Sequence, residues 1–287
     1  MSDEWQTAPQ EAEAHQPRTL LEVQGLTVRF GGLVAVADLD LRVEEGEIFA
    51  LVGPNGAGKT TVLNCISGFV RPSSGSIRLA GQDLLALGTE RRAALGIGRT
   101  FQNGQLFSSM TVLENLLVGR HSRLRAGLFQ SLLPIGPARR EEAAARQRAR
   151  EVLAWLGLES YADRLVATLP AGLQKLVGVA RALAGEPRLL LLDEPAAGVP
   201  LREVAALADQ LRRWNAELGL TLLLIEHNME VVQAVAQRIC VLNYGRKLAE
   251  GEPATVLREP AVLEAYLGRE EEIDAREEGE VSDHAAG

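Results

Sequence analysis

Alternation of apolar and polar residues marks the first part of the chain. Between residues 26 and 30, and again between 39 and 43, the two kinds alternate, which predicts strands with one buried face. Turn residues at Gly31-Gly32 and Glu45-Gly46 break this pattern. Residues 20–52 are therefore expected to form an antiparallel β subdomain.

Uninterrupted apolar runs mark three further strands, at residues 48–52, 189–193 and 221–226. Such runs are typical of strands that are covered on both faces in a parallel sheet. Between the last two, apolar residues recur at helical spacing and predict the buried stripe of a crossover helix, formed by Val204, Leu207, Ala208, Leu211 and Trp214. We expect Trp214 to lie in the core.

A helical pattern occupies about residues 103–171, between the two groups of strands. Residues 111–118 and 139–156 carry its clearest periodicity, and an inserted helical subdomain is the interpretation. Within it, residues 120–133 are first basic and then apolar. That segment either packs inside the insert or lies against a bilayer or a loop of a membrane protein. The whole pattern predicts an α/β fold with a mostly parallel sheet, an antiparallel β subdomain and this insert.

The net charge of −8 belongs to the two ends of the 287-residue chain. Residues 269–287 have a net charge of −6 and residues 1–18 of −3, which leaves about +1 for residues 19–268. Acidic ends with few apolar residues are expected to be disordered tails around one folded domain, residues 19–268. The nearly neutral domain lacks the basic patch that nucleic-acid binding requires, so no nucleic-acid partner is expected.

Compartment follows from what the chain lacks. No apolar run approaches the roughly 18 residues of a membrane span, and the acidic N-terminal residues do not have the order of a secretory signal. The sequence has two cysteines, Cys65 and Cys240, each within an apolar pattern. We expect both to be free thiols in the core of a cytoplasmic protein.

Candidate chemistry begins directly behind the apolar run of residues 48–52. The segment fits the phosphate-binding pattern G-x-x-x-x-G-K-[ST], with Gly53, Pro54, Asn55, Gly56, Ala57, Gly58, Lys59, Thr60 and Thr61. Its glycines let backbone N–H groups converge on phosphate oxygens, and the following helix adds the positive end of its dipole. Lys59 is expected to reach the β- and γ-phosphates and Thr60 to face Mg²⁺. The chain is therefore expected to bind ATP or another nucleoside triphosphate.

Two carboxylates follow the apolar run of residues 189–192. In an open parallel sheet, ligands bind at the carboxyl ends of the strands, where Asp193 and Glu194 are expected to lie. Phosphoryl transfer needs charge neutralisation and a positioned nucleophile more than covalent help. Asp193 is therefore assigned to Mg²⁺, directly or through water, and Glu194 to polarising the attacking water.

Three more elements complete an order of motifs along the chain. Gln102 lies at the entry to the helical insert, Leu169, Pro170, Ala171, Gly172 and Leu173 precede a helix, and His227 ends the last apolar run. Together with the phosphate loop and the Asp193-Glu194 pair, this order resembles the ATP-binding subunit of ABC transporters over roughly residues 20–268.

The resemblance implies roles for these residues. Gln102 would contact Mg²⁺ and the attacking water, and His227 would contact the γ-phosphate and hold Glu194. Residues 169–173 would form the signature loop, which contacts the nucleotide held by a second subunit. Phe30 matches the aromatic residue that stacks on adenine, although strand alternation also allows it to point inward.

Several short segments of the chain resemble, more specifically, the ATPases of branched-chain amino-acid importers. The segments are residues 99–102, 110–115, 193–198 and 225–229, and the run Ala265-Tyr266-Leu267-Gly268. The resemblance implies membrane permease subunits as partners, a second ATPase subunit that is identical or merely similar, and indirectly an extracytoplasmic binding protein. It implies a location at the inner face of the cell membrane.

Two positions depart from the family pattern. Pro170 replaces the signature-loop serine, and Pro200 stands in a loop that usually reads Gly-Leu-Asn-Pro. A lost hydrogen bond to a charged group costs about 1.5–3 kcal/mol. These two prolines leave open a regulatory partner that binds ATP with weak hydrolysis. An export ATPase for lipid-like cargo and a soluble ATPase of repair or translation are further alternatives.

Overall fold

The computed structural model describes residues 18–100, 106–120 and 137–266. The predicted acidic tails, Gln102 and most of the basic and apolar segment at 120–133 lie outside these ranges. None of the helices within them combines the length and apolar character that crossing a bilayer requires.

A six-stranded sheet forms the centre of the fold, in the order β10-β9-β3-β8-β7-β6. Strands β9, β3, β8, β7 and β6 of this sheet are parallel to one another, and β10 pairs antiparallel with β9 at the edge. The strands are β3 (Ile48–Val52), β6 (Ile97–Arg99), β7 (Leu189–Asp193), β8 (Thr221–Ile225), β9 (Arg238–Asn243) and β10 (Arg246–Gly251). The expected mostly parallel sheet is thus confirmed.

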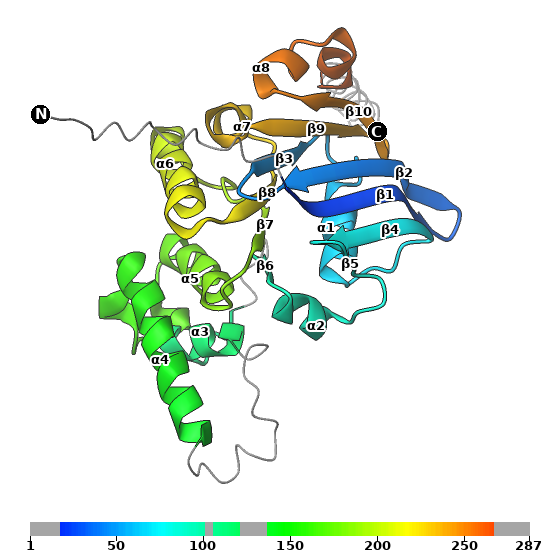
Figure 1. Cartoon of the computed structure of the whole chain (residues 1–287). Helices are drawn as coiled ribbons and strands as arrows, with labels where there is room; N and C mark the ends of the chain where they lie inside the picture. The colour runs from blue at the N-terminus through cyan, green and yellow to red at the C-terminus, as the bar shows by residue number, and fades with distance from the viewer. Residues whose placement is uncertain (1–17, 101–105, 121–136, 267–287) are drawn as a thin grey trace, which may run out of the picture.

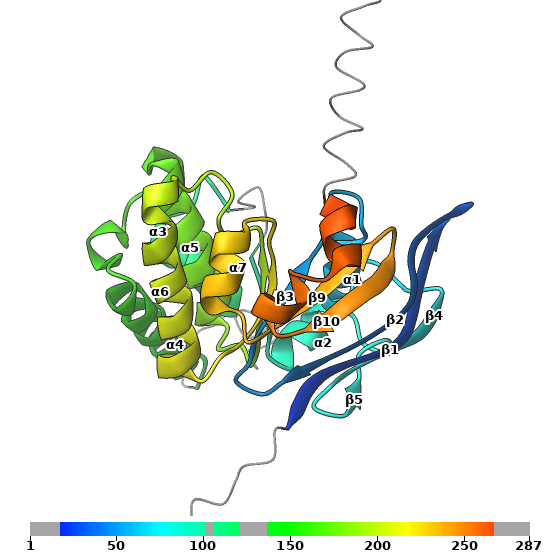
Figure 2. The ribbon, with the colours of Figure 1, turned by 90° about the horizontal axis from the view of Figure 1, so that it is seen from above.

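A second, four-stranded sheet packs against the first and is antiparallel, in the order β2-β1-β4-β5. Its long hairpin turns at Gly31-Gly32, where Phe30 pairs with Leu33. Figure 2 shows this sheet on one side of the molecule and most of the helices on the other. Its strands are β1 (Thr19–Phe30), β2 (Leu33–Glu44), β4 (Ser74–Leu79) and β5 (Gln82–Asp83).

The helices cover the central sheet on both faces (Figure 1). One core lies between the two sheets and includes α1, and a second core lies between the central sheet and α6 and α7. A third cluster joins α3, α4 and α5. The bounds are α1 (Lys59–Ser67), α2 (Thr89–Ala94), α3 (Val112–Arg120), α4 (Pro137–Trp155), α5 (Ala171–Ala184), α6 (Leu201–Leu218), α7 (Met229–Val235) and α8 (Pro253–Val256), with 3₁₀ turns at Glu159–Tyr161 and Val166–Thr168.

Successive side chains of a parallel strand point alternately to two different cores, which explains why the whole strand is apolar. In β3, Phe49 and Leu51 face the core between the sheets, whereas Ile48, Ala50 and Val52 face the core under α6 and α7. All five residues are buried. A polar side chain on either face would lie unsatisfied in a core, and this excludes the polar alternation seen in the antiparallel sheet.

Helical packing extends beyond the expected insert. Val177, Ala180 and Ala184 of α5 belong to the same cluster as α3 and α4, so the helical unit continues past residue 171 to the end of α5. Other residues of α5, such as Leu183, pack in the core with α6. α5 therefore connects the helical unit to the central sheet.

Both thiols lie in the core between the sheets, and burial raises the pKa of Cys65 to about 11 and that of Cys240 to about 12. The thiolate is the reactive form. We expect a disulfide reagent at pH 7.5 to modify neither thiol in the native protein and both after unfolding in denaturant. Rapid modification of either thiol in the native state would contradict this placement.

Candidate active site

The phosphate loop joins the carboxyl end of β3 to the start of α1. Gly53, Gly56 and Gly58 have φ values of 141°, 81° and 100°, which side chains with a Cβ rarely adopt. No side chain caps the N-terminus of α1. Its first backbone N–H groups are therefore left for an anionic ligand, as the sequence pattern requires.

Lys59 lies over this loop and is 6% exposed. Its Nζ donates hydrogen bonds to the carbonyl oxygens of Gly53 and Pro54, at 2.6 and 2.9 Å. The ammonium group is thus held above the loop. Around it, Asn55, Gly56 and Thr60 are exposed, Pro54 and Thr61 are half-buried, and Ala57 is buried.

Phe30 lies at the tip of the β1–β2 hairpin and is 50% exposed. This exposure is inconsistent with an inward strand residue and leaves the ring accessible to a planar ligand. Phe30 pairs with Leu33, and Ala35 follows two residues later in β2. A Cβ atom on Gly58 would lie 2.5 Å from the carbonyl oxygen of Ala35. The hairpin therefore lies directly against the phosphate loop.

Asp193 ends β7 and is paired with Arg99, which ends the neighbouring strand β6. The Arg99 Nη2 to Asp193 Oδ2 distance is 3.2 Å, and the two side chains are 9% and 3% exposed. Arg99 also donates to Asn64 Oδ1 and Ser67 Oγ of α1, at 2.8 and 3.1 Å. One guanidinium group thus links the phosphate-loop helix to the strand that carries Asp193.

The second oxygen of Asp193 fits a metal ion. Oδ1 is buried and has no hydrogen-bond partner among the described residues. Burial raises the pKa of this carboxyl above its ordinary value, although Arg99 opposes the shift. Carboxylate, hydroxyl and water oxygens are the ligands of Mg²⁺ in phosphate sites. Asp193 and Thr60 therefore carry oxygen atoms of the kind that would hold Mg²⁺.

Replacing Arg99 by methionine is expected to lower the free energy of unfolding by roughly 2–3 kcal/mol, because a buried carboxylate loses its charged partner. Urea unfolding measures this. Arg91→Met is the matched control: Arg91 is exposed on α2, and its replacement should change stability by less than about 0.5 kcal/mol. Equal stability of the two variants would contradict the linking role of Arg99.

Glu194 and His227 lie together at the carboxyl edge of the sheet. The backbone N–H of Glu194 donates to the carbonyl oxygen of Ile225 at 2.9 Å, which places the segments after β7 and β8 side by side. His227 Nδ1 lies 3.9 Å from Glu194 Oε1, and the side chains are 55% and 22% exposed. Glu194 has a φ of 50°, a left-handed conformation that is rare for residues other than glycine.

The signature-loop residues lie at the start of α5. Pro170 precedes the helix, and no side chain caps its N-terminus. Pro170, Ala171 and Gly172 are exposed, whereas Leu169 is buried against the helical cluster. The loop is thus presented at the surface, on the face of the central sheet opposite to α1.

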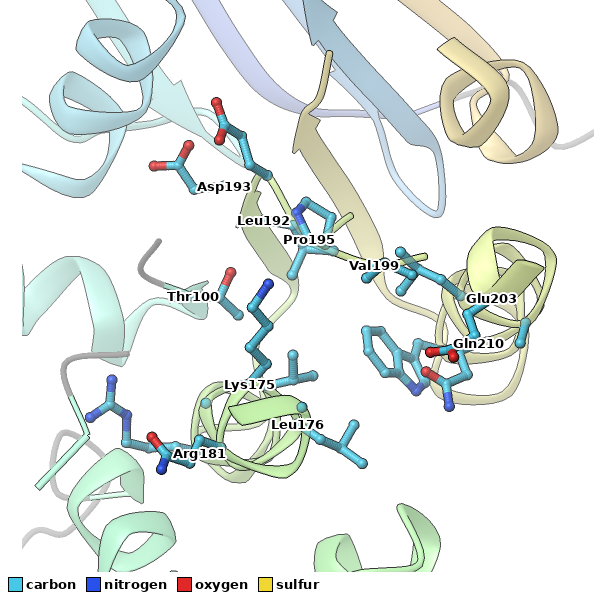
Figure 3. A pocket seen from close by; sticks show the side chains of 18 residues that line it. Thr100, Lys175, Leu176, Arg181, Leu192, Asp193, Pro195, Val199, Glu203 and Gln210 are labelled. Atoms are coloured by element: carbon cyan, nitrogen blue, oxygen red, sulfur yellow. The ribbon is translucent and has the colours of Figure 1, made fainter. Parts of the chain in front are cut away.

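A cavity of about 350 Å³ lies between α5 and α6 and reaches Asp193 and Glu194 at one end. Figure 3 looks into it: Lys175 of α5 points from one side, and Glu203 and Gln210 of α6 lie on the other. Lys175 Nζ donates to the carbonyl oxygen of Ala197, in the loop after Glu194. α5 therefore contacts the loop that carries Glu194 within the same chain.

The site residues named from sequence divide into two groups. The phosphate loop, Asp193, Glu194 and His227 gather at the carboxyl edge of the sheet, and residues 169–173 lie on another element. Gln102 lies outside the described residues. Arg99, which pairs with Asp193, was not recognised from the sequence, because a single charged residue beside a motif gives no signal of its own burial.

Two family models match the chain. The ABC transporter model matches residues 36–197, and the model of the branched-chain amino acid ATP-binding cassette transporter matches residues 246–272. The first match contains the phosphate loop, the signature loop and the Asp193-Glu194 pair. The second contains β10 and α8.

Curated relatives match nearly from end to end. The high-affinity branched-chain amino acid transport ATP-binding protein BraF of Pseudomonas aeruginosa is 43% identical over 251 residues, which are 88% of this chain and 98% of BraF. The protein LivG of Escherichia coli strain K12, with the same description, is 44% identical over 249 residues, 87% of this chain and 98% of LivG.

Solved structures have the same fold. The ADP conformation of an ATP-binding cassette of an ABC transporter superposes with a TM-score of 0.75 at 32% identity, covering 87% of this chain and 99% of that one. A dimeric bacterial ABC transporter cassette superposes with a TM-score of 0.69 at 26% identity, covering 82% and 99%. With the family model across more than half of its length and these relatives, the chain belongs to the ABC transporter family as an ATP-binding cassette.

Proposed function

We propose that this chain is the ATP-hydrolysing subunit of an importer for branched-chain or similar amino acids. The observation that carries the proposal is the identity of 43–44% to BraF and LivG over 98% of their lengths. The chain would work at the inner face of the membrane with permease subunits. The names of these relatives support import over the export of lipid-like cargo.

ATP would bind across the phosphate loop. Its phosphates would accept hydrogen bonds from the N–H groups of the loop and from the start of α1. Lys59 would exchange its contacts with the carbonyl oxygens of Gly53 and Pro54 for the β- and γ-phosphates. The exposed ring of Phe30 would stack on the adenine.

Thr60, Asp193 and Gln102 would hold Mg²⁺, which neutralises the charge that develops on the phosphates. Glu194 would orient the attacking water and accept its proton. His227, 3.9 Å from Glu194, would contact the γ-phosphate and hold the carboxylate in place. Charge-neutralising groups and a positioned nucleophile are what phosphoryl transfer needs.

A pair of cassettes would enclose each nucleotide. The phosphate loop and the signature loop lie on helices that cover opposite faces of the sheet, so the signature loop of a partner would complete the site. Pro170 has no hydroxyl to donate, which leaves the backbone of Ala171 and Gly172 and the helix dipole as phosphate contacts. The partner would be a second copy or a similar ATPase.

Affinity purification tests this proposal. The full-length Glu194→Gln variant, expressed in its native host, would be isolated from membranes with ATP present. We expect two multi-span permeases to co-purify. The same assembly with the wild-type chain in place of the variant, reconstituted in sealed vesicles, should take up labelled leucine, isoleucine or valine. Recovery of ribosomal or DNA-repair proteins, or of no membrane protein, would contradict the importer.

A further inference from the structure

Glu226 is a buried acidic residue with no assigned role. It follows the last residue of β8 and is 0% exposed. The preceding strand residues, such as Leu224 and Ile225, are apolar and equally buried. A carboxylate in such a place is costly unless every oxygen is satisfied. Its hydrogen bonds therefore indicate what it does.

Each carboxylate oxygen of Glu226 binds a different loop. Oε1 accepts the backbone N–H of Ala196 at 2.6 Å, in the loop that follows Glu194. Oε2 accepts the backbone N–H groups of His227 and Asn228, at 3.1 and 3.3 Å. One side chain thus connects the loop of Glu194 to the loop of His227.

Backbone donors do most to balance this buried group. Burial raises the pKa of Glu226, while the three N–H groups and, less strongly, the side chain of His227 oppose that shift. A pair of loops held only for stability could instead be joined by apolar packing, which is often as stable as buried charge. Hydrogen bonds differ in that they fix direction as well as distance.

Neighbouring contacts make both loops sensitive to this connection. Asn228 caps α7 by accepting the N–H groups of Glu230 and Val231 through its Oδ1. On the other side, Lys175 binds the carbonyl oxygen of Ala197, next to the N–H that Glu226 binds. The Glu194 loop is therefore held between Glu226 and α5.

We propose that Glu226 is a positioning residue for ATP hydrolysis, which keeps Glu194 and His227 in register by binding the backbone of both loops. This inference rests on the roles proposed above for Glu194 and His227. These side chains lie 3.9 Å apart. Their relative placement decides whether Glu194 can orient the attacking water while His227 contacts the γ-phosphate. A misplacement of about 1 Å can lower a rate by 10²-fold.

Glu226→Gln separates this role from simple burial. Glutamine has the same size but only one acceptor oxygen, so one of the two loops loses its acceptor and meets an amide donor instead. The hydrogen bonds of Glu226 to the described residues go to the loops of Glu194 and His227 and not to the phosphate loop. We therefore expect the kcat of ATP hydrolysis to fall by about 10- to 100-fold, whereas the KM for ATP and the Kd of a non-hydrolysable ATP analogue stay within about twofold.

The assembly purified with the full-length chain serves for the measurement, with phosphate release for kcat and thermal unfolding as the check on folding. Glu47→Gln is the matched control, because Glu47 is also a largely buried carboxylate that accepts a backbone N–H, from Glu44 at 2.7 Å. It lies next to the amino end of β3, away from the site. Its kcat should stay within twofold of the wild-type value. If Glu226→Gln does not fold, Glu226→Asp replaces it, since it keeps the charge but shortens the reach.

A double-mutant cycle with His227→Ala completes the test. If Glu226 acts through His227, its replacement should lower kcat much less in the His227→Ala background than in the wild type. An unchanged kcat, an equal loss in the Glu47→Gln control, or fully additive losses would overturn the inference. Glu194→Gln in the same assay tests the proposed function separately: if it retains turnover, the assigned roles fail whatever Glu226 does.

Discussion

Replacing Glu194 by glutamine is expected to lower ATP turnover by about 10³-fold while leaving ATP binding nearly unchanged. The amide cannot accept the proton of the attacking water, and general-base catalysis contributes about 10²–10⁴-fold. The phosphate loop lies on another strand and keeps its contacts, including those of Lys59. Phosphate release and equilibrium binding of ATP measure the two effects.

Glu203→Gln is the control for this variant. Glu203 lines the same cavity from α6, is 55% exposed, and within the described residues its carboxylate pairs with the neighbouring Arg202. The same chemical change should therefore leave turnover within about twofold. A Glu194→Gln protein that retained half of the wild-type turnover would require another proton acceptor at the carboxyl edge of the sheet.

Gly53→Ala is expected to destabilise the protein by more than about 3 kcal/mol and to abolish ATP binding. A Cβ at this position would lie 2.1 Å from the carbonyl oxygen of Leu242 in β9, and the φ of 141° is unfavourable for alanine. Relieving the overlap requires either the phosphate loop or β9 to move. Chemical unfolding and ATP titration measure the outcome.

Gly81→Ala separates conformation from crowding. Gly81 also has a positive φ, 81°, but apart from its chain neighbours no atom of the described residues lies within 4 Å of the Cβ position. Only the left-handed conformation is then penalised, by about 1–2 kcal/mol, and ATP binding should persist. Equal losses in the two variants would contradict the close approach of the phosphate loop to β9.

The parallel strands could be predicted from sequence because both of their faces are buried. A residue facing either core must be apolar, so β3, β7 and β8 read as continuous runs. The phosphate loop could be predicted for a related reason: its glycines occupy conformations that other residues rarely adopt. Where local geometry restricts residue type, the sequence carries the information.

Other features depend on contacts between distant segments. The alternation in β1 was compatible with either an inward or an exposed Phe30. The side chain is exposed because Phe30 lies at the tip of the hairpin. The three-residue strand β6 is too short for a pattern, yet it places Arg99 beside Asp193. Glu226 resembles any polar residue at a strand end until Ala196, 30 positions away, is seen to donate to it.

The placement of α1 and α5 on opposite faces of one sheet has a genetic consequence. If two copies of this chain form the proposed pair, each copy contributes its phosphate loop to one site and its signature loop to the other. A substitution in either loop would then act dominantly in a cell that also expresses the intact chain, because the altered copy impairs one of the two sites in every pair it enters. If the partner is a different ATPase, an altered copy would compete with the intact one for partners, and dominance would fall with its share of the pool.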